Sequence, residues 1–247
     1  MNNLENLNIL ITGASGGIGT SLSKTFASTN ANLFLVGSTE EKISKLRDKV
    51  PHKDNINYFA VDLSQRENVS KFCDSIIKEY GGISVIINNA GITEDSIFMR
   101  MSDSAWDKVF AINLNASMLI CRKFIRGMIK NKWGRIVNIS SVVASTGNPG
   151  QSNYVATKGA LNGLTKSLAL EVATRGVTVN CISPGFIDTA MTAKLTDDQK
   201  LKITERIPMG RMGTGNDISS LVLFLVGNEA SYITGQNIHV NGGLYLP

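Results

Sequence analysis

Short, almost continuous apolar runs alternate with longer helical stretches along most of this chain of 247 residues. The runs cover residues 8–12, 32–36, 56–61, 84–88, 135–140, 177–183 and 237–240. Strands that are apolar on both faces are typical of parallel sheets, because right-handed crossovers place helices on both sides. The pattern therefore predicts an α/β fold: a doubly wound, seven-stranded parallel sheet with helices on both faces, in a single domain over residues 1–247.

Composition removes several classes of protein from consideration. No apolar run reaches the roughly 18 residues of a membrane span, and the N-terminus lacks a secretory pattern, so we expect a cytoplasmic protein without membrane insertion. Cys73, Cys121 and Cys181 are far apart and form no CxxC pair, which predicts buried core thiols. With only His52 and His239, no metal site is expected. The net charge of +5 is scattered rather than clustered, which argues against nucleic-acid binding.

A glycine-rich loop follows the first predicted strand. It reads Thr12-Gly-Ala-Ser-Gly-Gly-Ile-Gly19, and a helical stretch comes next. Glycines allow a tight turn and a close approach of the backbone to a pyrophosphate, while the helix N-terminus offers free N–H groups. An ordinary glycine-rich turn is the alternative. The position between a strand and a helix favours a dinucleotide site and a Rossmann-like version of the doubly wound fold.

A second group of polar residues follows the fifth predicted strand. The strand ends at Ser140 and Ser141, and a helix begins near Gln151 after a loop that contains Gly and Pro. Tyr154 and Lys158 are four residues apart on this helix, so they share one face. A lysine cation near a phenol favours the phenolate and lowers its pKa, so the group can move a proton. Together with a dinucleotide site, these residues predict an oxidoreductase.

These motifs resemble those of the short-chain dehydrogenase/reductase family, whose cofactor loop reads TGxxxGxG, and the resemblance covers essentially the whole chain. It implies a catalytic tetrad of Asn113, Ser141, Tyr154 and Lys158. The separation of thirteen residues from serine to tyrosine selects Ser141 over Ser140. In the family, the asparagine interrupts a long helix, here predicted over residues 103–131, and holds a water.

The resemblance also implies the cofactor-binding residues, which follow the ends of several strands. They are Gly13, Ser15, Gly16, Gly17, Ile18, Gly19, Ser38, Thr39, Asp62, Leu63, Asn89, Ala90, Gly91, Tyr154, Lys158, Pro184, Gly185, Ile187 and Thr189. No carboxylate ends the second strand, where one would bind the ribose 2′-OH of NAD, so NADP(H) is expected, with Ser38, Thr39 and Lys42 as 2′-phosphate contacts. Alternatively, Ser38 and Glu41 form a capping box, and Asp62 serves as a cap or turn residue.

Stretches such as residues 91–101, 231–235 and 239–243 are similar to the family branch that reduces β-ketoacyl thioesters in fatty-acid synthesis. This similarity implies NADPH, a homotetramer and an acidic acyl carrier protein as partner, with Lys132 and Arg175 as docking residues. Residues 189–210 are predicted to form a substrate lid, with a capping box at Thr196 and Gln199. A sugar, steroid or small ketone as substrate, and a cofactor-binding role without turnover, stay open.

Overall fold

A parallel sheet forms the centre of the fold. The structure is a computed structural model that describes residues 4–189, 192 and 196–247. Within these residues seven strands form one sheet in the order β3-β2-β1-β4-β5-β6-β7. The strands are β1 (Asn8–Thr12), β2 (Asn32–Gly37), β3 (Ile56–Ala60), β4 (Val85–Asn88), β5 (Gly134–Ile139), β6 (Val177–Pro184) and β7 (Asn237–Val240). The predicted fold is confirmed, and every predicted strand agrees with the observed strand to within one residue at either end.

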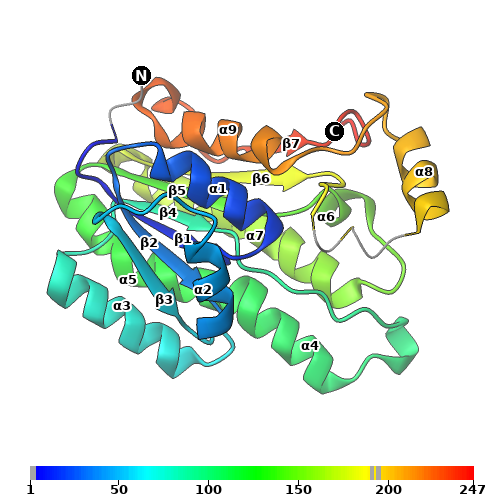
Figure 1. Cartoon of the computed structure of the whole chain (residues 1–247), viewed down its shortest axis with the longest axis horizontal. Helices are drawn as coiled ribbons and strands as arrows, with labels where there is room; N and C mark the ends of the chain where they lie inside the picture. Colours follow the sequence, from blue (N-terminus) through cyan, green and yellow to red (C-terminus); the bar gives the residue numbers. More distant parts are fainter. Residues whose placement is uncertain (1–3, 190–191, 193–195) are drawn as a thin grey trace.

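Helices cover both faces of this sheet (Figure 1). In β1, Ile9 and Ile11 are buried in the core cluster on one face, whereas Leu10 belongs to the cluster on the other face. The first face is covered by α1 (Gly17–Ala27), α2 (Glu40–Arg47) and α9 (Gly215–Val226), and the second by α3 (Arg66–Tyr80), α5 (Ala116–Asn131) and α7 (Ser152–Val172). Because both faces are covered, the strands are apolar throughout rather than alternating.

The predicted helix over residues 103–131 has a break in its middle. It consists of α4 (Asp103–Phe110), a π-helical turn (Ala111–Asn115) and α5. Asn113 is fully buried at the centre of this turn. Single π turns inside α-helices frequently lie at functional sites. The prediction that Asn113 interrupts the helix is confirmed.

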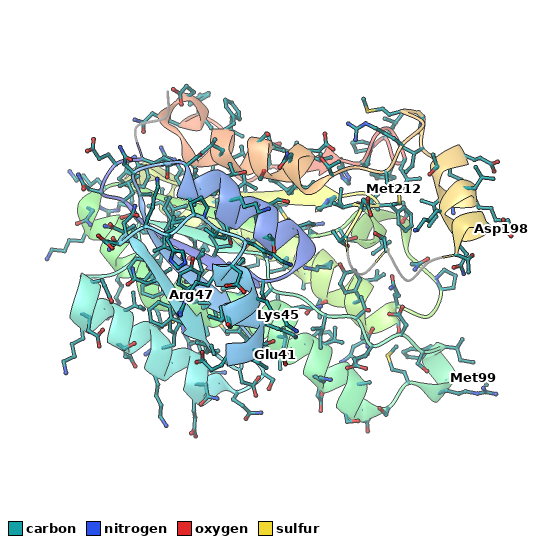
Figure 2. All side chains as sticks on the ribbon, viewed as in Figure 1. Glu41, Lys45, Arg47, Met99, Asp198 and Met212 are labelled. Atoms are coloured by element: carbon teal, nitrogen blue, oxygen red, sulfur yellow. The ribbon has the colours of Figure 1, made fainter. Side chains whose placement is uncertain are left out.

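Helix caps show one correct and one wrong prediction. The capping box of Thr196 and Gln199 is present at the start of α8 (Asp197–Glu205). The predicted box of Ser38 and Glu41 is wrong, because α2 begins one residue later, where the Thr39 hydroxyl accepts the backbone N–H of Lys42 at 3.3 Å. The Glu41 carboxylate instead pairs with Lys45 one turn along the exposed face of α2 (Figure 2).

The carboxyl ends of the strands meet at one edge of the sheet because all pairings are parallel. From β1 the chain extends the sheet first toward β3 and then, from β4, in the other direction. Such a reversal opens a crevice at the carboxyl edge, where doubly wound sheets bind ligands. The elements that follow this edge are η1 (Phe98–Arg100), α6 (Val143–Thr146) and α8, whereas η3 (Ala173–Arg175) and η5 (Asn228–Ala230) precede β6 and β7.

The structure also bears on membrane-spanning helices, metal clusters and the cysteines. In the described ranges, no helix combines the length and apolar character needed to cross a membrane. The same residues contain no cluster of three or more His, Cys, Asp or Glu side chains that could hold a metal ion. Cys73, Cys121 and Cys181 are free thiols buried in the protein, as predicted.

Candidate active site

A cavity of about 680 Å³ lies along the carboxyl edge of the sheet, and loops after β1 to β6 line it. It collects nearly all of the predicted site residues from these separate segments. The predicted residues that line it are Gly13, Ser15, Gly16, Gly17, Ile18, Gly19, Ser38, Lys42, Asp62, Leu63, Asn89, Ala90, Gly91, Ser141, Tyr154, Lys158, Pro184, Gly185, Ile187 and Thr189. Four predicted residues, Thr39, Asn113, Lys132 and Arg175, are not part of this lining.

The glycines of the first loop serve different purposes. Gly13 has a φ of 62°, and a Cβ there would lie 2.7 Å from the Ala90 Cα, so this glycine allows β1 and β4 to meet closely. A Cβ on Gly19 would lie 2.0 Å from the Gly13 carbonyl oxygen, so Gly19 closes the loop onto itself. Gly16 lines the cavity as the N-cap of α1 and forms no side-chain capping bond. The N–H groups at the start of α1 are therefore available to an anion.

The loop after β4 is held against β1 by a residue that sequence reasoning did not select. The Thr12 hydroxyl accepts the backbone N–H groups of Asn89 and Ala90, both at 3.1 Å. In return the Asn89 side-chain amide donates to the carbonyls of Thr12 and Gly13, both at 3.0 Å. A threonine at the last position of a strand that runs into glycine is the sequence signal for such a clamp.

Asn113 lies beneath the cavity and connects three elements. Its side-chain amide accepts the backbone N–H of Ile92 at 2.9 Å and donates to the Ile92 carbonyl at 3.0 Å. It also donates to the Thr157 hydroxyl on α7 at 3.2 Å. The π turn therefore fixes the loop after β4 relative to α7. The expected water on Asn113 stays a prediction.

Ser141, Tyr154 and Lys158 face the same cavity, from the end of β5 and from consecutive turns of α7. The Lys158 Nζ donates to the carbonyl of Ile139 at 2.7 Å and lies 5.6 Å from the centre of the Tyr154 ring. Ser140, the alternative serine, is buried, and its hydroxyl donates to the Lys158 carbonyl at 2.9 Å. Both serines line the cavity, but the Ser140 hydroxyl is already bound to a main-chain carbonyl, which favours Ser141 as the residue that meets a substrate.

Burial dominates the electrostatics of Tyr154 and Lys158. Burial raises the pKa of Tyr154, a hydrogen bond with Ser141 lowers it in part, and the charge of Asp95 raises it further. Burial lowers the pKa of Lys158 to about 8. Loss of water dominates the pKa of Tyr154 here, and the Lys158 ammonium group donates to a main-chain carbonyl, so the expectation that Lys158 lowers this pKa beside a bound cofactor stays a prediction.

The end of the cavity beside β2 and β3 is polar. The Ser38 hydroxyl accepts a hydrogen bond from the Lys42 Nζ at 3.0 Å, and both residues line the cavity. Asp62 also lines it, and its carboxylate accepts the backbone N–H and the hydroxyl of Ser64 at 2.9 and 2.7 Å, so the turn interpretation of Asp62 holds as well. The Thr39 hydroxyl instead caps α2.

The opposite end of the cavity has a polar mouth that the sequence did not predict. Asp95, Asn148 and Gln151 line it, together with the apolar side chains of Ile92 and Phe186. Gln151 precedes Tyr154 by three residues, and this helical spacing is the signal that could have revealed it. The predicted lid includes residues 190–191 and 193–195, which lie outside the described residues. At its base, Gly213 exchanges backbone hydrogen bonds with residues 186 and 188.

Lys132 and Arg175 lie at the amino-terminal edge of the sheet, just before β5 and β6. The two segments touch, since a Cβ on Gly176 would lie 2.3 Å from the Lys132 carbonyl oxygen. The strand β5, which has six residues, separates them from the cavity by about 20 Å. A role for this basic pair in docking a carrier protein stays a prediction.

The residues of the cavity fit an extended anionic dinucleotide. Its volume is in the range of cofactor sites. The start of α1 supplies N–H groups for the pyrophosphate, and Gly91 leaves room beside Lys158, because a Cβ there would lie 3.2 Å from the Lys158 Nζ. The polar groups at one end and the tyrosine at the other would hold the two halves of such a molecule.

Comparison with known proteins agrees with this geometry. A family model described as enoyl-(acyl carrier protein) reductase, which belongs to the short-chain dehydrogenases/reductases, matches residues 13–245. Nodulation protein G of Rhizobium sp. (strain N33) is 46% identical over 237 residues, 96% of each chain. The chain belongs to the short-chain dehydrogenase/reductase family.

Two further members of this family define the similarity more closely. The 3-oxoacyl-[acyl-carrier-protein] reductase of Rickettsia conorii is 46% identical over 237 residues, and that of Aquifex aeolicus is 43% identical over 238 residues, in both cases 96% of each chain. The protein is thus an oxidoreductase of a family that uses a nicotinamide cofactor, and it is similar to these reductases over almost its whole length.

Proposed function

We propose that this protein reduces 3-oxoacyl-[acyl-carrier-protein] to (3R)-3-hydroxyacyl-[acyl-carrier-protein], with NADPH as the hydride donor, in the elongation cycle of fatty-acid biosynthesis. The observation that carries the proposal is the meeting of Ser141, Tyr154 and Lys158 at one end of a dinucleotide-sized cavity. Sequence similarity to 3-oxoacyl-[acyl-carrier-protein] reductases supports the substrate class.

The chemistry assigns a separate task to each side chain. A bound nicotinamide cofactor supplies a hydride to the carbonyl carbon of the substrate. Negative charge then grows on the carbonyl oxygen, and Tyr154 donates its phenolic proton to that oxygen. Ser141 donates a hydrogen bond to the same oxygen and so stabilises the charge. The raised pKa of Tyr154 keeps the phenol protonated at neutral pH, as an acid requires.

Lys158 and Asn113 support this acid. Lys158 would turn from the Ile139 carbonyl toward the nicotinamide ribose and there favour the departure of the proton from Tyr154. Asn113, fixed by its bonds to Ile92 and Thr157, would hold the water that returns a proton to Tyr154 through Lys158.

The choice of NADPH rests on the polar end of the cavity. Ser38 and Lys42 form a donor pair at the end of β2, whereas the nearby Glu41 carboxylate is bound to Lys45 on the exposed face of α2. A cationic ammonium group suits a 2′-phosphate. We expect Lys42→Ala to weaken the binding of NADPH more than that of NADH. The ratio of kcat/KM with NADPH to kcat/KM with NADH should fall about tenfold. An unchanged preference would remove Lys42 from the assignment.

The partner and assembly follow from the same similarity. The proposed substrate is a β-ketoacyl thioester on acyl carrier protein in the cytoplasm, and the proposed assembly is a homotetramer. Lys132 and Arg175 lie on segments that touch, and two cations there would suit an acidic carrier. Charge reversal at Arg175 should reduce turnover of the carrier-linked substrate and leave turnover of the coenzyme A thioester unchanged.

The test of the whole proposal is the loss of NADPH absorbance with acetoacetyl thioesters of carrier protein and of coenzyme A, with NADH in parallel. We expect NADPH-dependent turnover that is faster on carrier protein. Tyr154→Phe should lose nearly all turnover while it still binds NADPH. Cofactor binding without reduction of either thioester would refute the substrate assignment, and activity of Tyr154→Phe within tenfold of wild type would refute the role of the tyrosine.

A further inference from the structure

Three polar side chains at the mouth of the cavity form a connected row. The Asp95 carboxylate accepts hydrogen bonds from the Gln151 Nε2, with both oxygen atoms at 3.1 Å. The Gln151 Oε1 in turn accepts the Asn148 side-chain amide at 2.9 Å. This row joins the loop after β4 to the start of α7. Gln151 therefore holds the carboxylate in place at the mouth rather than leaving it to swing into solvent.

The charge of this carboxylate has no cation beside it in the described part of the chain. None of the salt bridges found there includes Asp95. Its neighbour Glu94 is different, because its carboxylate pairs with Lys108 at 2.6 Å and does not line the cavity. The two adjacent acidic residues thus differ in the one property that matters, an uncompensated charge that faces the cavity.

Few other charges share this cavity. The charged residues in its described lining are Lys42, Asp62, Asp95 and Lys158. Lys42 and Asp62 follow β2 and β3, at the end away from Tyr154. Lys158 is buried and donates to a main-chain carbonyl. Asp95 is therefore the negative charge that a substrate meets on its way to Tyr154, and its effect already reaches the phenol.

We propose that Asp95 determines substrate specificity by charge, so that the site accepts esterified 3-oxo acids and rejects the free acids. This inference rests on the proposed function and deepens it. A 3-oxoacyl thioester is neutral around its two carbonyl groups, whereas the free acid carries a carboxylate two carbons from the ketone. Like charges held near each other in a partly solvated cleft repel, and here the repulsion opposes binding of the free acid only.

The test compares methyl acetoacetate with acetoacetate, two ketones that differ chiefly in this charge. Asp95→Asn removes the charge and keeps an oxygen that accepts the bond from Gln151. We expect the ratio of kcat/KM for acetoacetate to that for methyl acetoacetate to rise about tenfold in this variant. Glu94→Gln is the matched control. It removes one negative charge from the neighbouring residue, and the ratio should stay within about twofold of wild type, because Lys108 already compensates Glu94.

Salt separates a charge effect from a structural one. In wild type, reduction of acetoacetate should accelerate with ionic strength because salt screens the repulsion, and Asp95→Asn should lose this dependence. A ratio that Asp95→Asn leaves unchanged, or that Glu94→Gln changes equally, would overturn the role of Asp95 while the reductase activity stands. A wild-type enzyme that reduces neither this ester nor the acetoacetyl thioesters would instead overturn the proposed function, and the inference with it.

Discussion

We expect the burial of Lys158 beside the cavity to lower the free energy of unfolding of the protein. Its ammonium group is buried and donates to one main-chain carbonyl among the described residues, and burial lowers its pKa from 10.5 to about 8. A lysine whose folded-state pKa is depressed binds its proton more weakly in the folded than in the unfolded chain. The free energy of unfolding should therefore rise with pH through the interval between the two pKa values.

The magnitude follows from the shift. At about pH 7 both states are protonated, and the fall of the folded-state pKa to about 8 costs about 3 kcal/mol. At about pH 9.5 the folded state has released its proton and the unfolded state has not, so the cost falls to about 1 kcal/mol. The Lys158 contribution to stability should thus improve by about 2 kcal/mol over this range.

Lys158→Met removes the titrating group and keeps an unbranched side chain of similar length. Urea unfolding of both proteins without cofactor, at about pH 7 and about pH 9.5, gives the four free energies that are needed. The difference between them cancels the groups that titrate independently of Lys158. We expect wild type to gain about 2 kcal/mol relative to the variant as pH rises. Parallel pH dependences, or a relative loss, would refute the reasoning.

Five further variants test the local structure by urea unfolding, and the last of them also by activity. Gly19→Ala should lower the free energy of unfolding by more than about 2 kcal/mol, because its methyl group would overlap a backbone carbonyl. Gly127→Ala should raise it by about 0.5–1 kcal/mol, because the structure leaves open space there. Equal effects of the two substitutions would contradict the packing argument. Thr39→Ala should lower the free energy of unfolding by about 1 kcal/mol, and Ser38→Ala should lower it by less. The reverse order would favour Ser38 as the cap of α2. Asn113→Leu leaves the buried backbone groups of Ile92 unpaired, and it should lower the free energy of unfolding by about 2–3 kcal/mol and remove most activity. A stable and active variant would contradict the role of Asn113 in fixing the loop after β4.

The sequence was sufficient for those parts of the site that depend on local pattern. Apolar runs without alternation indicated buried parallel strands, and strand direction alone brings the ends of six strands to one edge. The glycine loop and the spacing of Tyr154 and Lys158 are short-range features that neighbouring residues determine. For this reason the predicted strands and the assembly of the cavity agree with the structure, whereas the break at Asn113 was implied by the family resemblance.

Helix caps, contacts between distant segments and pKa values could not be predicted from the sequence, because they depend on groups that meet only in the folded protein. The cap of α2 shifted to Thr39 because helix geometry, not spacing, selects which hydroxyl reaches the first-turn N–H groups. The Thr12 clamp and the pair of Asn113 with Ile92 join segments far apart in the chain. The pKa of Tyr154 is raised because burial and the charge of Asp95 outweigh the hydrogen bond with Ser141, and the spacing of Tyr154 and Lys158 carries no information on these contacts. Motif and periodicity thus determined which residues are present at the site, whereas burial and long-range contacts determined their charge states and their partners.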